Sequence, residues 1–499
     1  MRIAMVYPQY PDTFFSFKYA LNLISKKAMY PPLGLLTVAA MLPVEWEKKL
    51  IDMNVTGLTD KDILWADYVF ISAMQVQSNS VKEVIVRCNK LNRKVVAGGP
   101  LFTLSHHSFD GISHFVLGEA ENTLPSFLSD LENGCAKPLY ESNERPELSR
   151  TPLPLWSLIN MKDYSTMNMQ YSRGCPFDCE FCDIVALFGR KPRTKSCYQL
   201  INELENLYKS NWRGEVLIVD DNLIGNKQKL KKEILPAIIE WSSSKQYPFY
   251  FMAQVSIDLA DDEELMNLMV KAGISLIFIG IESPNEDSLA ECNKLPNKNR
   301  DLVVLVNKLQ NCGFEVIGGF IIGFDSDPDS IFESHIDFIQ RSGIVIAMVG
   351  MLTALRGTRL YQRLKEENRL ISDSSGDNTD NSINFIPKMN RDMLINGYMH
   401  VLDTIYSSDY YYRRVKKFFR EYRPPKKQAS GMEFNYVISL VKALWILGIV
   451  EDGRKAFWKF SVSTLFKYPQ FFWLSVSYSI YRRHFYKHAQ KLASNQTLK

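Results

Sequence analysis

The sequence predicts an α/β protein in three successive parts: a doubly wound parallel sheet, a partial (β/α)6 barrel of the TIM type, and a mainly helical C-terminal region. Through the first two parts, short apolar runs alternate with longer stretches of helical periodicity, which is typical of parallel sheets covered by helices. A chain of 499 residues also exceeds what one hydrophobic core usually organises. We place the three parts at residues 1–140, 166–360 and 361–499, with a linker at 141–165.

The first part contains five short apolar runs that we predict to be strands. Helical stretches at 33–42, 81–91 and 120–131 lie between several of them. Ligands of a doubly wound sheet bind at the carboxyl ends of its strands, and two loops, 73–78 and 98–103, are expected there. The five runs lie at 3–7, 50–53, 68–72, 95–97 and 115–117.

The linker is predicted from its prolines at 146, 152 and 154 and its lack of periodicity. Six strand-like runs follow it, and most are followed by a stretch of helical pattern. Such units predict a partial barrel, whose chemistry lies at the carboxyl ends of the strands. The six runs lie at 169–172, 216–220, 249–255, 276–281, 316–322 and 344–351.

The C-terminal region is basic and aromatic. From residue 411 onward there are 18 Lys and Arg against 4 Asp and Glu, whereas the whole chain has a net charge of only +4. The last 89 residues also hold 20 of the 61 aromatic residues. This composition suits an interfacial membrane surface, a helical cap with an aromatic core, or single-stranded nucleic acid. We favour membrane-surface contact, then core packing, and regard nucleic acid as the least favoured partner.

Three further observations concern the compartment. No run reaches the ~18–20 uninterrupted apolar residues that a spanning helix needs. The N-terminus lacks the basic and apolar regions of a signal peptide. The eight cysteines do not form a disulfide framework, since three crowd into eight residues and five are scattered. We therefore expect a cytoplasmic protein, peripheral to the inner membrane face if its C-terminal region binds there.

Residues 372–382 are expected to be a flexible loop.

The motif QYSRGCPFDCEFC at residues 170–182 carries the chemistry. Thiolates are the usual ligands of iron–sulfur clusters, and a complete [4Fe–4S] site normally uses four of them. Three close thiolates, from Cys175, Cys179 and Cys182, would bind three irons. The fourth iron would stay open for a small molecule that chelates it through amino and carboxylate groups.

Two other kinds of cysteine site fit the spacing less well. Structural zinc needs four Cys or His ligands, and the closest upstream histidine, His114, lies in the first predicted part. A redox-active pair would show the C-x-x-C spacing alone. We therefore predict an iron–sulfur cluster at this motif.

The spacing C-x3-C-x-Φ-C, with Phe181 as the aromatic residue, resembles the signature of radical S-adenosylmethionine (SAM) enzymes. Seven segments resemble the cobalamin-binding-domain class of that family. They are SRGCPFDCEFCDI, LFGRKPRTKS, IVDDNLIGN, IGIESPNEDSL and GGFIIGFD, together with PPLGLL and VVAGGPLFT in the first part. Within the class, the chain is similar to the branch with a helical C-terminal extension, which includes hopanoid methylases and archaeal tetraether-lipid enzymes. The resemblance covers roughly residues 1–400, and the C-terminal tail matches only in character. It implies a Rossmann-like cobalamin-type domain followed by a radical SAM barrel.

Three cofactors are implied by this resemblance: a [4Fe–4S] cluster, SAM and cobalamin. SAM would bind the open iron. One electron from an external flavodoxin- or ferredoxin-like donor would then cleave it to methionine and a 5′-deoxyadenosyl radical.

The same resemblance implies SAM-binding residues at the strand ends. Asp220, Asp221 and Asn222 occupy the place of the family's motif for the SAM amino group, although Asp and Asn equally favour helix N-caps. Glu282 is the next candidate, with a structural salt bridge as its alternative. The other candidates are Phe181, Gln254, Ser256, Gly318 and Gly319, of which the glycine pair could instead mark a bulge.

The doubly wound domain could bind cobalamin, bind a nucleotide or serve only as a scaffold. No G-x-G-x-x-G follows the first strand. The D-x-H-x-x-G motif that supplies a histidine to cobalt is also absent, and His106 and His107 do not fit it. The resemblance favours cobalamin, which the domain would bind without a histidine ligand from that motif. The contact residues it implies are Ala73, Gln75, Gln77, Ser78, Gly98, Gly99, Pro100 and Thr103.

One motif departs from the pattern of the family. Where relatives usually carry a Pro-Gly-Thr-Pro-like sequence after the sixth strand, this chain has Arg356 and Arg359 on either side of Gly-Thr. These two added positive charges indicate either an anionic substrate group or a changed surface loop.

The leading hypothesis is a cobalamin-dependent radical SAM methyltransferase that acts on an unactivated carbon of an apolar, lipid-like substrate. One alternative is carbon–carbon coupling or cyclisation by the same radical, and another is a non-catalytic iron–sulfur or RNA-binding protein. S-adenosylhomocysteine as a coproduct would indicate methylation. Cleavage of SAM that disappears in Cys179→Ala would argue against the non-catalytic class.

Overall fold

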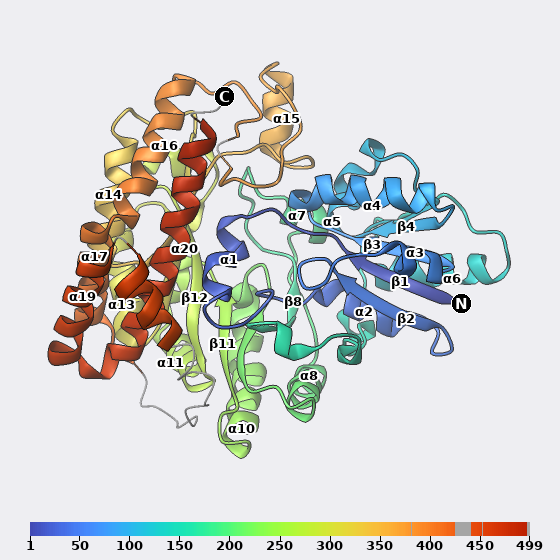
Figure 1. Cartoon of the computed structure of the whole chain (residues 1–499), viewed down its shortest axis with the longest axis horizontal. Helices are drawn as coiled ribbons and strands as arrows, with labels where there is room; N and C mark the ends of the chain where they lie inside the picture. The colour runs from blue at the N-terminus through green and yellow to red at the C-terminus, as the bar shows by residue number, and fades with distance from the viewer. Residues whose placement is uncertain (381, 425–440, 452, 497–499) are drawn as a thin grey trace.

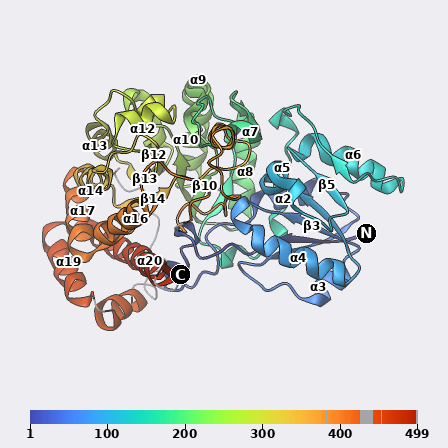
Figure 2. The ribbon, with the colours of Figure 1, turned by 90° about the horizontal axis from the view of Figure 1, so that it is seen from above.

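The computed structural model describes residues 1–380, 382–424, 441–451 and 453–496. Two six-stranded parallel sheets form the body of the chain. The first sheet lies beside the second, and the helices after residue 390 lie on the far side of the second sheet (Figures 1 and 2). The predicted fold class is confirmed, while the divisions at residues 140, 165 and 360 stay a prediction.

The first sheet has the order β2-β1-β3-β4-β5-β6. All five predicted strands are present, and a two-residue edge strand, β6, was not predicted because it is too short to show a pattern. Buried apolar clusters line both faces of this sheet, as expected for parallel strands covered by helices. The strands are β1 Arg2–Tyr7, β2 Glu47–Asp52, β3 Tyr68–Ser72, β4 Lys94–Gly98, β5 His114–Val116 and β6 Leu139–Tyr140, and the helices are α1 Lys18–Leu21, α2 Leu33–Met41, α3 Asp60–Trp65, α4 Ser78–Lys90, α5 Pro100–Ser105 and α6 Ala120–Glu132.

The second sheet has the order β14-β13-β12-β11-β10-β7, so its strands follow the chain in turn as in a barrel that stays open. Its strands are β7 Met167–Met169, β10 Gly214–Ile218, β11 Phe249–Gln254, β12 Ile274–Glu282, β13 Glu315–Ile322 and β14 Ile346–Met351. Its helices include α7 Ile184–Phe188, α8 Cys197–Lys209, α10 Leu235–Ser244, α11 Glu263–Lys271, α12 Glu286–Glu291, α13 Leu302–Cys312, α14 Ile331–Ser342 and α15 Arg359–Glu366.

The first barrel strand differs from the predicted range of 169–172. The sheet pairing ends at Met169, because the carboxylate of Asp220 accepts a hydrogen bond from the Tyr171 N–H at 2.7 Å. Residues Ser172–Arg173 then form β8, which pairs antiparallel with β9, Arg193–Thr194. The predicted run 169–172 therefore continues past the end of β7, because Tyr171 and Ser172 are buried although they follow the strand.

The two faces of the open barrel differ in burial. Along β11, Phe249, Phe251 and Ala253 are buried, while Tyr250 and Gln254 on the other face are exposed. Since side chains of a strand alternate between faces, the outer face packs on helices and the inner face is incompletely filled. A complete TIM barrel fills this interior with side chains.

The C-terminal helices form an aromatic core of their own against the barrel. They are α16 Arg391–Tyr406, α17 Ser408–Glu421, α19 Arg454–Lys467 and α20 Phe472–Gln496. Phe419 stacks on Phe471 at a centroid distance of 4.8 Å, and Phe485 stacks on Phe14 of the N-terminal segment at 4.2 Å. Core packing therefore accounts for many of the aromatic residues in this region. Among the described residues, no helix is both long and apolar enough to cross a membrane.

A buried ion-pair network joins the two sheets. Arg173, the last residue of β8, contacts Glu119 at 2.7 Å and Glu121 at 2.8 Å, at the start of α6. Arg193 on β9 contacts Glu119 at 2.7 Å. The carboxyl end of β5 is thereby held against the carboxyl end of β7, so the functional edges of the two sheets face one another.

Replacing Glu121 should destabilise the protein in a pH-dependent way. Burial acts to raise the pKa of Glu121, but the hydrogen bonds and charge of Arg173 outweigh it and lower this pKa to about 2. The ion pair therefore contributes stability above pH ~4.5, the ordinary value for Glu, and loses it as the pH falls toward 2. In Glu121→Ala we expect a loss of roughly 3 kcal/mol at pH 7, measured by denaturant unfolding, which shrinks below pH ~4.5. Exposed Glu144, in the linker that follows the first sheet, is the control, and equal stability of Glu121→Ala and Glu144→Ala would contradict the prediction.

Candidate functional site

The three motif cysteines lie on the loop between β8 and α7, past the carboxyl end of the first barrel strand. All three are half-buried and none is in a disulfide. Burial raises the pKa of the Cys175, Cys179 and Cys182 thiols, while the nearby charge of Lys294 lowers it. Three desolvated thiols beside a buried cation suit a metal that binds thiolates. Within the described chain, no three His, Cys, Asp or Glu side chains gather closely enough for a single metal ion.

The motif Asp220–Asn222 anchors the cysteine loop from one side. Asp220 is fully buried and accepts hydrogen bonds from Tyr171 and Ser172. Asp221 accepts one from the N–H of Gly174 at 3.1 Å, directly before Cys175. Burial raises the pKa of Asp220 to about 7 and that of Asp221 to about 6.

Asn222 does not act as the helix cap that the sequence allowed. It stands before the short 3-10 helix Leu223–Asn226 but makes no side-chain cap. Instead its amide exchanges hydrogen bonds with Ser256, 3.1 Å from Nδ2 to Oγ and 3.3 Å from the Ser256 N–H to Oδ1. A SAM-binding role for these residues stays a prediction, in which Asp221 rather than Asp220 has the accessible side chain.

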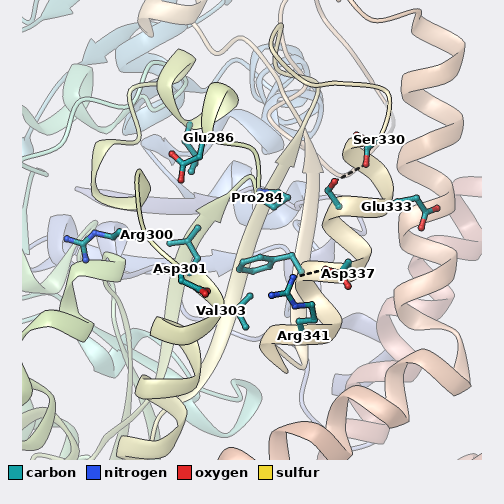
Figure 3. A pocket seen from close by; sticks show the side chains of 13 residues that line it. Pro284, Glu286, Arg300, Asp301, Val303, Ser330, Glu333, Asp337 and Arg341 are labelled. Atoms are coloured by element: carbon teal, nitrogen blue, oxygen red, sulfur yellow. Dashed lines mark hydrogen bonds and ion pairs between the residues drawn. The ribbon is translucent and has the colours of Figure 1, made fainter.

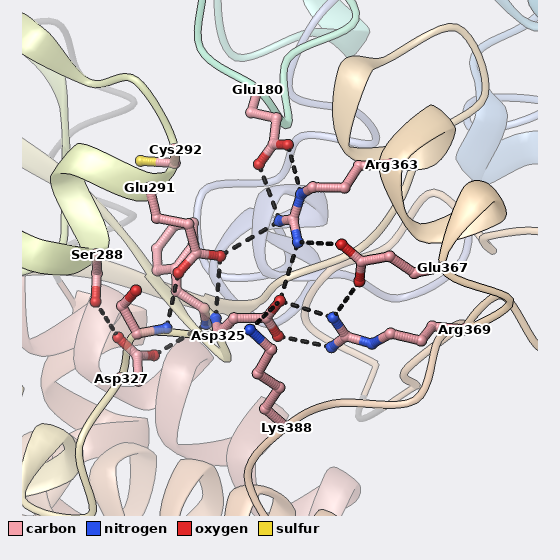
Figure 4. A network of polar contacts seen from close by, with 12 residues as sticks. Glu180, Ser288, Glu291, Cys292, Asp325, Asp327, Arg363, Glu367, Arg369 and Lys388 are labelled. Carbon is pink, nitrogen blue, oxygen red and sulfur yellow. Dashed lines mark hydrogen bonds and ion pairs between the residues drawn. The ribbon is translucent and has the colours of Figure 1, made fainter.

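A second ion-pair network anchors the cysteine loop from the opposite side (Figure 4). Arg363 of α15 binds both carboxylate oxygens of Glu180, between Cys179 and Phe181, at 2.7 and 3.0 Å. It also reaches Asp325 at 3.0 Å, which in turn binds Arg369 at 2.6 Å. Bidentate pairing of Arg with carboxylate fixes geometry as well as position. Sequence analysis missed this network, because its partners lie far apart in the chain and belong to no motif.

Arg356 and Arg359, in the motif that departs from the family pattern, form ion pairs within the protein. Arg356 binds Asp373 at 2.8 Å, and Arg359 approaches Asp178 of the cysteine loop at 3.3 Å. Their charges are therefore neutralised locally, which favours the changed surface loop over an anionic substrate site.

Glu282 forms a salt bridge within the protein, which is the structural role that the sequence offered as an alternative to SAM binding. Its carboxylate lies 2.7 Å from the Lys294 Nζ. The backbone of Glu282 has φ +64°, and the strand pairing shifts register there. A Cβ on Gly280 would lie 2.1 Å from the Glu282 carboxylate, so glycine is needed for the side chain to fold back. Strained backbone of this kind is typical of functional sites, and Lys294 is a site residue that no sequence motif indicated.

The remaining SAM candidates lie on different faces of the sheet. Gln254 is exposed on the inner face of β11. A Cβ on Gly319 would meet Phe278 at 2.8 Å on the inner face, whereas one on Gly318 would meet Phe320 on the outer face. The pairing of β12 with β13 shifts register between Gly280 and Glu282, opposite Gly319 and Phe320, so the bulge alternative for the glycine pair stays open. Phe181 is half-buried, with its ring 6.3 Å from that of Phe324.

The predicted cobalamin residues divide into two groups. One group makes contacts within the first sheet: Gln77 is buried and binds the backbone of Met74 and Pro8, and Thr103 bonds Gly99 at 2.9 Å and Gly118 at 3.0 Å. Ala73 is buried, Gly98 lies against the Val116 carbonyl, Gly99 has φ +88°, and Pro100 begins α5.

The second group, Gln75 and Ser78, lines a cleft of about 530 Å³ between the first sheet and the loop 372–384. Gln75 also bonds the Ser374 carbonyl at 3.0 Å. Ser105 lines the same cleft, and its buried hydroxyl has no hydrogen-bond partner among the described residues. Buried polar groups are normally paired, so this cleft suits a polar ligand with amide or phosphate groups, as cobalamin has.

A larger hollow of about 770 Å³ lies outside the barrel, between α13 and α14 (Figure 3). Its charged groups pair with protein partners, such as Arg341 with Asp337 at 3.1 Å and Arg300 with Asp261 at 2.8 Å. None of the predicted site residues lines it. The candidate site is therefore the edge that carries the cysteines.

Three families match the chain in succession. The B12 binding domain matches residues 20–128, the radical SAM superfamily residues 169–339, and a domain of unknown function, DUF4070, residues 358–497. The order and extent of these matches agree with the two sheets and the helical region.

Two relatives match nearly the whole chain. An uncharacterised methyltransferase of Synechocystis sp. is 38% identical over 98% of this chain and 92% of its own length. The hopanoid C-2 methylase of Rhodopseudomonas palustris is 30% identical over 93% of this chain and 90% of its own.

A solved structure shares the fold. It is the radical SAM methyltransferase TsrM from Kitasatospora setae, with a TM-score of 0.57 at 14% identity over 75% of this chain and 77% of that one. A second structure of the same protein, described with cobalamin and a [4Fe–4S] cluster bound, gives a TM-score of 0.56 at 13% identity. Together with the full-length relatives and the family matches, these similarities show that the chain belongs to the cobalamin-dependent radical SAM methyltransferases with a C-terminal DUF4070 domain, whose cofactors are a [4Fe–4S] cluster, SAM and cobalamin.

Proposed function

We propose that this enzyme methylates an unactivated carbon of an apolar, lipid substrate bound inside the open barrel. Cys175, Cys179 and Cys182 would hold the cluster, and the ends of β10 to β12 would hold SAM. The observation that carries the proposal is the half-exposed, largely apolar inner face of the barrel. It lies directly beneath the cysteine loop, at the edge that faces the first sheet.

The inner face offers apolar surface to a substrate. Leu217, Met252 and Phe278 are only partly covered on β10, β11 and β12. Phe15, from the N-terminal segment, is 45% exposed, and its ring lies 6.5 Å from that of Phe278. Exposed apolar side chains that line a concave face are typical of ligand sites. An apolar molecule fits this lining better than a charged one.

The base of the same face is polar. Glu215, at the start of β10, accepts a hydrogen bond from Thr166 at 3.1 Å, and Glu315, at the start of β13, accepts one from Tyr478 at 2.7 Å. Both residues are half-buried. They can accept or donate hydrogen bonds to a hydroxyl group. We infer a substrate with one polar end at the base and its reacting carbon near the cysteines.

The cofactors, when bound, supply the radical that activates the substrate carbon and the methyl group that is transferred to it. The protein's own residues fix the cysteine loop through Asp220, Asp221 and Arg363 and hold the two sheet edges together through Arg173. Phe14 stacks on Phe485, and we infer that this N-terminal segment, whose Phe15 lies beside Phe278, shields the inner face from water. A radical enzyme needs such exclusion to protect its intermediates from side reactions.

Partners follow from the same proposal. Enzymes of the radical SAM family need an electron donor, and we propose an external flavodoxin- or ferredoxin-like protein for this chain. We also propose a cytoplasmic location at the inner face of the membrane, with contact through the C-terminal region, because a lipid substrate is found there. The hopanoid C-2 methylase among the relatives supports the substrate class.

Reconstitution tests the proposed function. After anaerobic loading with iron, sulfide and hydroxocobalamin, we expect about four irons and one cobalt per chain. With SAM, a reductant and a bacterial lipid extract, methyl-labelled SAM should label an apolar product and yield S-adenosylhomocysteine, methionine and 5′-deoxyadenosine. Cys179→Ala should lose the cluster and all products, while Cys135→Ala, at an exposed cysteine, should keep both. A product without S-adenosylhomocysteine would favour coupling or cyclisation instead.

Lys294 should tune the cluster. Its positive charge lies near all three thiols, and it stabilises the reduced, more negative cluster. We expect Lys294→Met to keep its iron but to shift the midpoint potential negative by tens of millivolts, measured by EPR-monitored titration. Lys294→Arg, which keeps the charge and a partner for Glu282, should stay near the wild-type potential, as should Lys298→Met. An unchanged potential in Lys294→Met would refute this role.

Glu215 should make stability depend on pH. Burial, opposed by the Thr166 hydrogen bond and aided by the charge of Glu315, raises the pKa of Glu215 to about 7. Its stabilising contribution is then complete below pH ~4.5 and is lost as the pH rises through 7. Relative to wild type, Glu215→Gln should gain stability from pH 5 to pH 8, measured by thermal unfolding. Glu83→Gln, at an exposed site on α4, is the control. A difference between Glu215→Gln and wild type that does not change with pH would contradict the assignment.

A further inference from the structure

Large apolar side chains are exposed on the C-terminal helices around α19, which lies at the end of the molecule farthest from the first sheet (Figures 1 and 2). Soluble proteins seldom expose many large apolar side chains close together. Nine such side chains lie within residues 441–473, which is a small part of the chain: Val441, Trp445, Ile449, Val450, Trp458, Val462, Leu465, Phe466 and Trp473.

These side chains form two stripes that meet. Val441, Trp445 and Ile449 follow one another at intervals of four on the helical residues 441–450, so they share one face. Trp458, Val462 and Phe466 do the same on α19. The Trp458 Nε1 donates to the Gly448 carbonyl at 2.9 Å, which joins the two stripes into one surface. We call it the apolar ridge.

The apolar ridge has cations beside it. Lys416 of α17 lies among Arg420, Lys459 and Lys467, and burial together with these like charges lowers its pKa. Within the described residues, none of these four cations has an acidic partner at ion-pair distance; the nearest pair on α17 is Lys417 with Glu421 at 3.6 Å. Like charges held together without partners are unfavourable unless an anionic surface compensates them.

We propose that the apolar ridge and its cations dock the enzyme onto an anionic lipid bilayer. Tryptophan and phenylalanine settle at the boundary between headgroups and acyl chains, and lysine and arginine bind anionic headgroups. A second copy of the chain would bring the same cations together and repel itself. Charge complementarity therefore selects an anionic lipid surface as the occupant.

The position of α20 connects this surface to the barrel. Trp473 is exposed at its start, and Tyr478, five residues later, bonds Glu315 at the base of the barrel at 2.7 Å. Five residues of α-helix span about 8 Å. Docking would thus bring the base of the barrel, where the polar end of the proposed substrate lies, close to the bilayer. This last step rests on the proposed function, whereas the docking itself does not.

Vesicle flotation with the reconstituted full-length enzyme tests the docking. Phosphatidylcholine vesicles with and without phosphatidylglycerol are the probes, and we expect binding to the anionic vesicles that weakens at high salt. The double variant Lys459→Ala/Lys467→Ala should bind about 25-fold more weakly, about fivefold for each charge removed. Trp445→Ser/Phe466→Ser should lose binding to the anionic vesicles. Tyr198→Ser, at a 76% exposed aromatic on α8, is the matched control and should bind like wild type.

Two results would overturn the proposal: wild-type enzyme that stays in solution with anionic vesicles, or ridge variants that bind like Tyr198→Ser. A wild-type dimer that dissociates in Trp445→Ser/Phe466→Ser without any vesicle binding would show a second copy as the occupant instead. Reductive cleavage of SAM without vesicles should be equal in all variants. Loss of docking with intact SAM cleavage would therefore leave the proposed function standing.

Discussion

The rest of the structure depends on the charged side chains that hold the cysteine loop in one position. A loop that must present three thiolates has little regular structure to fix it, so side chains must do so. On one side Asp221 holds the backbone directly before Cys175 at 3.1 Å, and on the other Arg363 holds Glu180 at 2.7 and 3.0 Å. Each holder is itself buried or paired, so the loop has one position. Without this, binding of a cluster would have to order the loop as well.

The same loop also aligns the two sheets. Arg173 lies two residues before Cys175 and is the centre of the ion pairs with Glu119 and Glu121. A shift of the first domain would therefore pull on the cysteine loop directly. Because ligands of both sheet types lie at the carboxyl ends of the strands, joining these edges brings the two cofactor sites of the family together.

Much of this could be predicted from local sequence, and the rest could not for identifiable reasons. Strands buried on both faces show as apolar runs, which is why eleven of the twelve strands of the two sheets were anticipated and only two-residue β6 was missed. The cysteine motif was visible because its ligands are close in the chain. Lys294 and Arg363 were invisible, since their partners are brought to them by the barrel and not by spacing. Asp220 shows the opposite problem: its motif was noticed, but its full burial became clear only once Tyr171 and Ser172 were placed around it.

The C-terminal region shows how one composition can serve two purposes at once. Core packing and membrane contact are competing explanations of its aromatic residues when only composition is known. In the structure they divide by helix face: Phe419, Phe460 and Phe471 are buried in the aromatic core, while Trp445, Phe466 and Trp473 point outward. The helix α20 belongs to both, because its start is exposed and its next turns close the base of the barrel through Tyr478. If the substrate is apolar, as proposed, this arrangement lets the helix that closes the barrel also lie where the substrate is dissolved.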